Sequence, residues 1–146
     1  MNISAQAIHL NEREKFKVGK TVLITGASTG IGFALAKRFV VEGYKVVISA
    51  NDSQRLATAE KQLNLLSQNC VETIVQNLAC TEGAQALVDE LNRREIMVDI
   101  LVNNAGFSVY GVFTEASCTD TLAMLQLNMV SLTHLTKLLL PDMIKK

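Results

Sequence analysis

The chain lacks the features that mark membrane, nucleic-acid-binding and metal-binding proteins. None of its apolar runs approaches the roughly 18 residues that a membrane-spanning helix needs. Its 14 basic and 14 acidic residues cancel, so the net charge gives no general attraction to nucleic acid or to an anionic membrane. His9 and His134 are too few and too isolated to predict a metal cluster. We therefore expect no nucleic-acid partner, no membrane association and no metal site.

Cysteine is also scarce. Cys70, Cys80 and Cys118 are an odd number without C-x-x-C spacing, which predicts neither a disulfide framework nor a zinc site. The first ten residues lack the cationic segment and apolar run of a signal peptide. These absences predict free thiols in a cytoplasmic protein.

The composition that remains is that of a folded domain. Apolar residues make up 49% of the chain and charged residues 19%, which excludes intrinsic disorder. Residues 1–19 are polar and mixed in charge, and we expect them to form a leader outside the core. The domain is then expected over residues 20–146.

Short apolar runs alternate with segments of helical periodicity. The runs at 21–25, 45–49, 71–75 and 98–102 predict buried parallel strands. Helices are predicted after Gly32, closing at Gly43, then over 53–68, over 81–94 and from about residue 119 to the end. This alternation is typical of βαβ units. We expect an α/β fold of three layers, α/β/α, around a Rossmann-like doubly wound parallel sheet of about four strands.

Details of the helices follow from single residues. The helix over 53–68 is expected to bury Leu66 and to be capped by Asp52 or Ser53, and Thr81 is expected to cap the next helix. The last helix, with a possible kink at Pro141, is apolar nearly all round. Its main stripe is Leu122, Leu125, Met129, Leu132, Leu135 and Leu139. Such a helix should be buried all round, which predicts a dimer or an exposed apolar surface.

Gly26, Gly30 and Gly32 form a G-x-x-x-G-x-G turn directly after the first predicted strand. Glycine lets the backbone turn tightly and lets a pyrophosphate approach without a Cβ in the way. The helix that follows would offer free N–H groups and a positive dipole end. The turn therefore favours a phosphate site, with ordinary turn glycines as the alternative.

Three motifs together resemble the short-chain dehydrogenase/reductase family: TGASTGIG at 25–32, NNAG at 103–106 and Asn128 within LQLNMVSL. The resemblance covers the chain from Thr21 to its end. It implies a doubly wound fold, a bound NAD or NADP, and hydride transfer between the cofactor and a small-molecule alcohol or carbonyl substrate. It also implies a homodimer or higher oligomer that associates through the last helix.

The resemblance assigns site residues position by position. The cofactor-binding set is Gly26, Ser28, Thr29, Gly30, Ile31, Gly32, Asn51, Asn77, Leu78, Asn103, Ala105 and Gly106. Asn77 stands where many members carry Asp, and its amide can still hydrogen-bond an amino group. Asn103 and Asn104 have a second interpretation, as braces of neighbouring backbone. Phe107, Ser108 and Tyr110 would form one wall of the substrate site, with ordinary loop packing as the alternative.

The choice of cofactor is weakly encoded. Relatives that prefer NADP often carry a cation where this chain has Thr29 or Asn51, and both positions are uncharged here. Asp52 is a carboxylate one position on, suited to a ribose 2′-hydroxyl, whereas Arg55 falls inside the next helix. These residues favour NAD slightly over NADP.

The family's catalytic Ser and Tyr-x-x-x-Lys are missing. Tyr44 is followed four positions later by Ile48, and Tyr110 by Thr114. Asn128 is the one member of the catalytic set that is present, with helix packing as its alternative role. We therefore expect a truncated, catalytically incomplete N-terminal portion of such an oxidoreductase. The alternatives are a non-enzymatic nucleotide-binding or partner-binding module, or a chain whose missing half is supplied by another polypeptide.

Overall fold

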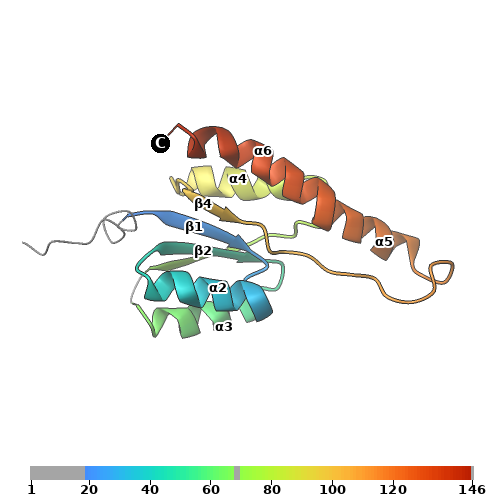
Figure 1. The fold of residues 1–146 in the computed structure, drawn as a ribbon, viewed down its shortest axis with the longest axis horizontal. Helices are drawn as coiled ribbons and strands as arrows, with labels where there is room; N and C mark the ends of the chain where they lie inside the picture. The colour runs from blue at the N-terminus through green and yellow to red at the C-terminus, as the bar shows by residue number, and fades with distance from the viewer. Residues whose placement is uncertain (1–18, 68–69, 146) are drawn as a thin grey trace, which may run out of the picture.

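The computed structural model describes residues 19–67 and 70–145. Four parallel strands form one sheet in the order β3-β2-β1-β4 (Figure 1). The strands are β1 (Thr21–Thr25), β2 (Lys45–Ala50), β3 (Val71–Val75) and β4 (Ile100–Val102). The helices are α2 (Gly30–Val41), α3 (Ser53–Asn64), α4 (Gly83–Arg93), α5 (Cys118–Leu125), the π-helix η1 (Gln126–Ser131) and α6 (Leu132–Met143). The expected α/β fold is confirmed, and the expected leader lies almost wholly outside the described residues.

Helices cover both faces of the sheet, which gives the expected three layers. Side chains of a strand alternate between its faces, so successive residues of β1 enter different cores. Val22 and Ile24 pack with α2 and α3, whereas Leu23 packs with α4 and α6 (Figure 1). All three side chains are fully buried. The strands are therefore continuous apolar runs because both of their faces are covered.

Two predicted helix boundaries were wrong. The helix α3 begins at Ser53 and ends at Asn64, so Leu66 lies beyond it and is exposed. Its N-terminus is as predicted, because the Asp52 carboxylate accepts a hydrogen bond from the backbone N–H of Arg55 at 2.9 Å. Thr81 does not cap α4, which begins at Gly83 without a side-chain cap. Residues 80–83 instead form a tight turn in which the Gly83 N–H donates to the Cys80 carbonyl.

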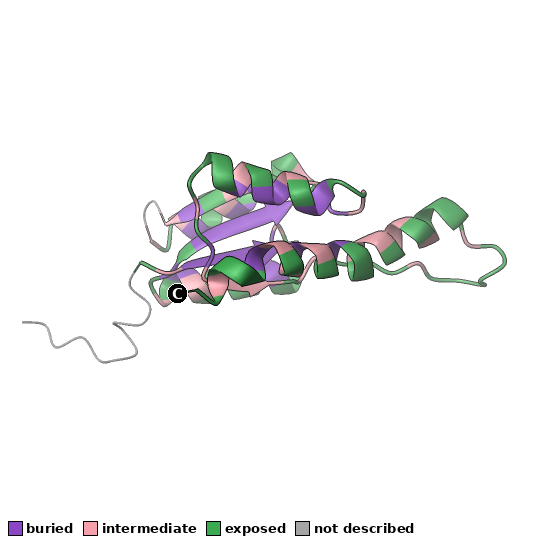
Figure 2. Ribbon diagram, turned by 90° about the horizontal axis from the view of Figure 1, so that it is seen from above, coloured by how far each residue is buried: buried purple, intermediate pink, exposed green. Residues whose placement is uncertain are grey.

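The last helix also differs from its prediction. It is interrupted by η1 at Gln126–Ser131, and α6 continues past Pro141 to Met143. Of the expected stripe only Leu135 and Leu139 are buried. The stripe residues Leu122, Leu125, Met129 and Leu132 are exposed, which is the exposed apolar surface predicted as the alternative to a dimer. For Leu122, Leu125 and Met129 the cause is geometric, because α5 and η1 project beyond the end of the sheet and have no strand beneath them (Figures 1 and 2).

The strand order places a crevice at one end of the sheet. From β1 the chain moves outward through β2 and β3, then returns to add β4 on the other side of β1. In open parallel sheets ligands bind outside the carboxyl ends of the strands, at the point where this direction reverses. The loops that follow the four strands are therefore the place to look for a functional site.

Candidate functional site

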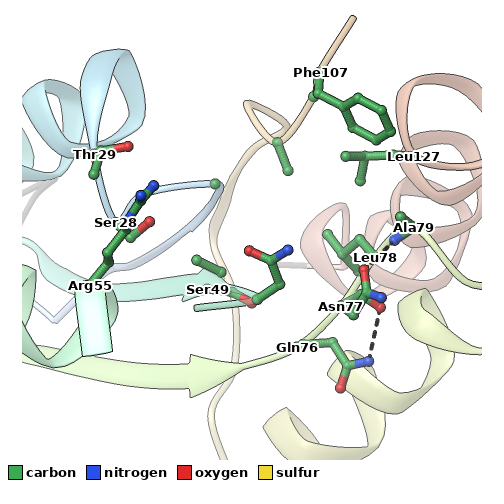
Figure 3. A pocket seen from close by; sticks show the side chains of 15 residues that line it. Ser28, Thr29, Ser49, Arg55, Gln76, Asn77, Leu78, Ala79, Phe107 and Leu127 are labelled. Atoms are coloured by element: carbon green, nitrogen blue, oxygen red, sulfur yellow. Dashed lines mark hydrogen bonds between the residues drawn. The ribbon is translucent and has the colours of Figure 1, made fainter. Parts of the chain in front are cut away.

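A cleft of about 430 Å³ lies at the carboxyl ends of the strands (Figure 3). It brings together segments that are far apart in the sequence. The lining residues are Gly26, Ser28 and Thr29 after β1, Ser49, Ala50 and Asn51 at the end of β2, Arg55 of α3, Gln76, Asn77, Leu78 and Ala79 after β3, Ala105, Gly106 and Phe107 after β4, and Leu127 of η1. Eight of these belong to the predicted cofactor-binding set.

The turn after β1 leaves no room for side chains. Gly26 has a positive φ of 66°, and a Cβ on it would lie 2.7 Å from the Cα of Ala105. A Cβ on Gly32 would overlap the side-chain amide of Asn104 and would lie 2.6 Å from the Gly26 carbonyl. Bare backbone is therefore required where the turn meets the loop after β4.

The N-terminus of α2 is open for an anion. The Thr29 side chain makes no capping hydrogen bond, and no acidic residue occupies the first turn of the helix. The first N–H groups of a helix have no partner within the helix, and the helix dipole makes that end positive. Ser28 and Thr29 line the cleft directly before this end. A phosphate group in the cleft would meet donors and a favourable potential.

The two asparagines after β4 have different roles. The Asn104 amide donates to the Thr25 carbonyl at 2.9 Å and to the Gly26 carbonyl at 3.0 Å. Asn104 thus braces the backbone, which is one of its two predicted roles. The Asn103 amide donates to the Thr136 hydroxyl of α6 at 3.0 Å, and Asn103 does not line the cleft.

Thr25 completes the brace between β1 and the loop after β4. Its hydroxyl oxygen accepts from the backbone N–H of Asn104 at 3.1 Å and of Ala105 at 3.0 Å. The same hydroxyl donates to the Val102 carbonyl at 3.4 Å. One buried side chain therefore holds the ends of two adjacent strands together.

Ser49 is a site residue that the sequence analysis missed. Its hydroxyl is buried without a hydrogen-bond partner, and the residue lines the cleft. A buried polar atom without a partner is costly, so this hydroxyl suits a ligand with a polar group at the cleft floor. The signal was present in the sequence, because Ser49 is the polar residue near the end of the apolar strand KVVISA.

Arg55 lies inside α3, as predicted, yet its side chain also lines the cleft. Among the described residues that line the cleft, Arg55 alone carries a formal charge. Its Nε atom lies 3.3 Å from the Asp52 carboxylate, which also caps the helix at the Arg55 N–H. Asp52 is therefore turned toward its own helix. Gln76, Ala79 and Leu127 are further lining residues that periodicity alone did not indicate.

A second hollow adjoins the cleft. It contains the three predicted substrate residues and Asn128, together with Ala105 and Gly106. The Asn128 amide accepts from the Phe107 N–H at 3.2 Å and donates to the Phe107 carbonyl at 2.8 Å. The side-chain amide of Asn128 is thus bonded to the wall formed by Phe107, Ser108 and Tyr110.

The remaining predicted residues lie near the cleft without lining it. Gly30 opens α2, Ile31 is exposed, and Gly32 is buried against Asn104 and the Gly26 carbonyl. Their contact with a cofactor stays a prediction. Across residues 19–67 and 70–145 there is no group of three His, Cys, Asp or Glu residues suited to a metal. The same residues contain no helix long and apolar enough to cross a bilayer.

Comparison with known proteins agrees with this geometry. An uncharacterized oxidoreductase of Staphylococcus saprophyticus is 32% identical over 127 residues, which are 87% of this chain and 54% of that protein. The L-sorbose reductase of Gluconobacter frateurii, solved with NADPH and L-sorbose, matches with a TM-score of 0.79 at 32% identity, over 87% of this chain and 48% of that one. An NAD⁺-bound xylitol dehydrogenase matches with a TM-score of 0.77 at 27% identity, over 90% and 50%.

The chain thus spans about half the length of the relatives it matches. The family model for short chain dehydrogenase matches residues 20–146, from just before β1 to the end. That span contains the glycine turn, the braced loop after β4 and Asn128. The chain belongs to the short-chain dehydrogenase family of oxidoreductases.

Proposed function

We propose that this chain binds NAD or NADP in the cleft at the carboxyl ends of the strands. The observation that carries the proposal is the Gly26 turn, where a Cβ is excluded beside an uncapped helix N-terminus. The pyrophosphate would lie there, over the turn that runs to Gly32. Asn51, Asn77 and Leu78 would hold the adenosine half.

The residues present fit such a cofactor. The cleft offers an uncharged wall for adenine and an unpartnered hydroxyl, that of Ser49, for a polar atom of the ligand. Ala105 and Gly106 belong to both the cleft and the second hollow, so they would lie beside the nicotinamide half. When bound, the nicotinamide ring supplies the hydride acceptor or donor.

The choice between NAD and NADP stays a prediction. The slight preference for NAD rests on the uncharged Thr29 and Asn51 and on Asp52, whose carboxylate is engaged by Arg55. Arg55 supplies a cation at the cleft, which suits a 2′-phosphate. Measured affinities for NAD and NADP would show which of the two cofactors the cleft prefers.

We further propose that the protein containing these residues transfers a hydride between the cofactor and a small alcohol or carbonyl compound bound in the second hollow. Phe107, Ser108 and Tyr110 would form one wall of that site, and Asn128 would hold its backbone in place. The general acid/base of the family, a Tyr followed four residues later by Lys, is not among the 146 residues. The 146-residue chain alone, a truncated form in this proposal, would bind cofactor without turnover.

A second candidate function is association through the last helix, as a homodimer or with another partner. It is supported by the exposed side chains of Leu122, Met129 and Val130. Sedimentation equilibrium of the chain tests it, and a monomer at all concentrations would exclude a homodimer. The zero net charge supports the absence of nucleic-acid and membrane partners. The free thiols of Cys70, Cys80 and Cys118 support a cytoplasmic location.

The experiment that tests cofactor binding is calorimetry of the full chain with NAD, NADP and AMP. We expect binding of AMP and of at least one dinucleotide, because the adenosine half of the site is present. Absence of binding to all three would overturn the proposal. Oxidation or reduction of the cofactor by this chain with an alcohol or ketone would overturn its catalytic incompleteness.

A further inference from the structure

The π-helix η1 contacts the loop that forms the adenine side of the proposed cofactor site. The buried Ser131 hydroxyl donates to the Leu78 carbonyl at 2.6 Å. The Gln126 amide donates to the Ser131 hydroxyl at 3.0 Å and to the Cys80 carbonyl at 3.4 Å. Two side chains of one helix turn thus bond two carbonyls of the loop after β3.

The π geometry is what brings these two side chains together. Residues five apart in an α-helix point about 140° away from each other, since each residue turns by about 100°. In a π-helix the hydrogen bonds run from i to i+5, so Gln126 and Ser131 come to lie on the same side. Asn128, within the same turn, bonds the Phe107 backbone in the loop after β4.

The loop that they hold carries the adenine wall. Asn77, Leu78 and Ala79 line the cleft, and Leu127 of η1 lines it on the same side, next to Leu78 and across from Ser28 and Thr29 (Figure 3). The start of α4 packs closely against the same loop, because a Cβ on Gly83 would lie 2.9 Å from the Cα of Leu78. Movement of the wall is therefore restricted by α4 on one side and by Gln126 and Ser131 on the other.

We propose that Gln126 and Ser131 are positioning residues for nucleotide binding, which act by fixing the wall formed by Asn77, Leu78 and Ala79. Neither residue lines the cleft, so their effect passes through the Leu78 and Cys80 carbonyls. The inference rests on the proposed cofactor site and adds to it a second layer of side chains. It predicts that nucleotide affinity depends on a hydroxyl that does not touch the nucleotide.

The test is the affinity of the full 146-residue chain for AMP, measured by calorimetry. Ser131→Ala removes the bond to Leu78, and we expect AMP to bind about five- to tenfold more weakly, as for loss of one buried hydrogen bond. The matched control is Thr121→Ala, which removes a hydroxyl of α5 that donates to the carbonyl of Ser117, the residue just before that helix. It should bind AMP as the wild type does.

A pair of isosteric variants separates positioning from general destabilisation. Ser131→Thr and Ser131→Val add the same bulk, but only the Thr variant keeps the hydroxyl. We expect Thr to retain most of the AMP affinity and Val to lose it. Gln126→Met, which keeps the length of the side chain without a donor, should weaken AMP binding in the same direction and serves if the Ser131 variants fail to fold.

The outcomes distinguish the two proposals. A wild-type chain that does not bind AMP would overturn the proposed cofactor site. A wild-type chain that binds AMP, with Ser131→Ala and Gln126→Met binding it within twofold of the same affinity, would overturn the positioning role alone. Equal affinities of the Thr and Val variants would also overturn it.

Discussion

The side-chain amide of Asn128 bonds both polar groups of the Phe107 backbone, accepting from its N–H and donating to its carbonyl. A Cβ on Gly106 would lie 3.1 Å from the amide oxygen, so the loop and the π-helix are in close contact there. The pair joins the wall of the second hollow to η1, the helix that also bonds the loop after β3. The first prediction concerns this pair.

Asn128→Ala should release the loop after β4. Both bonds to Phe107 are lost, and because the residue is exposed we expect about 1 kcal/mol of stability to be lost rather than the larger cost of a buried group. Urea unfolding measures it, and amide hydrogen exchange of Phe107 should become faster. Asn92→Ala, at an exposed position of α4, is the control. Unchanged exchange at Phe107 would contradict the brace.

Gly32→Ala should damage the cleft more than Gly43→Ala. An added Cβ at Gly32 meets Asn104 and the Gly26 carbonyl, and overpacking of this kind costs about 1–3 kcal/mol. Gly43 has a positive φ of 87° but open space, so its substitution costs about 1–2 kcal/mol from backbone strain alone. Only the Gly32 variant should lose AMP binding in calorimetry. Equal AMP affinities for the two variants would count against a role of the close packing at Gly32 in nucleotide binding.

Arg55→Ala should change the ratio of NADP affinity to NAD affinity. Arg55 is the charged side chain at the cleft, and its loss would remove a charge-assisted bond to a 2′-phosphate while leaving a 2′-hydroxyl unaffected. We expect the ratio to fall about fivefold, a modest value because the guanidinium is largely exposed. Arg38→Ala, on α2, controls for net charge. A constant ratio would remove Arg55 from cofactor discrimination.

Glu90 should titrate unusually low. Side-chain hydrogen bonds from Arg93 and then Arg94 lower the pKa of Glu90 from 4.5 to about 2. Because the folded-state pKa is depressed, the stabilisation is fully present above about pH 4.5 and is lost as the pH falls through about 2. Carboxyl carbon NMR shifts measure the pKa directly. Glu90→Gln should flatten the acid limb of the stability curve, and an ordinary pKa for Glu90 would refute the ion-pair network.

Most of the fold was predictable because its signals are local. The four strands are short apolar runs, and the glycine turn follows the first of them, so the sheet and the cleft were both expected from the sequence. Asp52 as a cap followed from its place before a helix. The glycine turn predicted bare backbone at Gly26, and the structure leaves no room for a Cβ there.

The misses depend on contacts between distant segments. An exposed apolar surface on the last helix was one of two predicted outcomes, but that Leu122 and Met129 form it depends on where the sheet ends, which periodicity does not encode. Thr81 is a good cap by residue type, but the close packing of Gly83 on the loop after β3 sets the start of α4. The π-helix η1 also depends on tertiary contacts, since Gln126 and Ser131 bond the loop after β3 there.

The hydroxyl of Thr25 couples the separation of β1 from β4 to the opening of the loop after β4. The β4 strand pairs with β1 over only three residues, so its ladder alone holds the two carboxyl ends weakly. The bonds of Thr25 to Val102, Asn104 and Ala105 share one oxygen atom. Widening of the crevice therefore breaks all of them at once, and we expect the amides of Asn104 and Ala105 to exchange with solvent at one common rate, as a single opening unit.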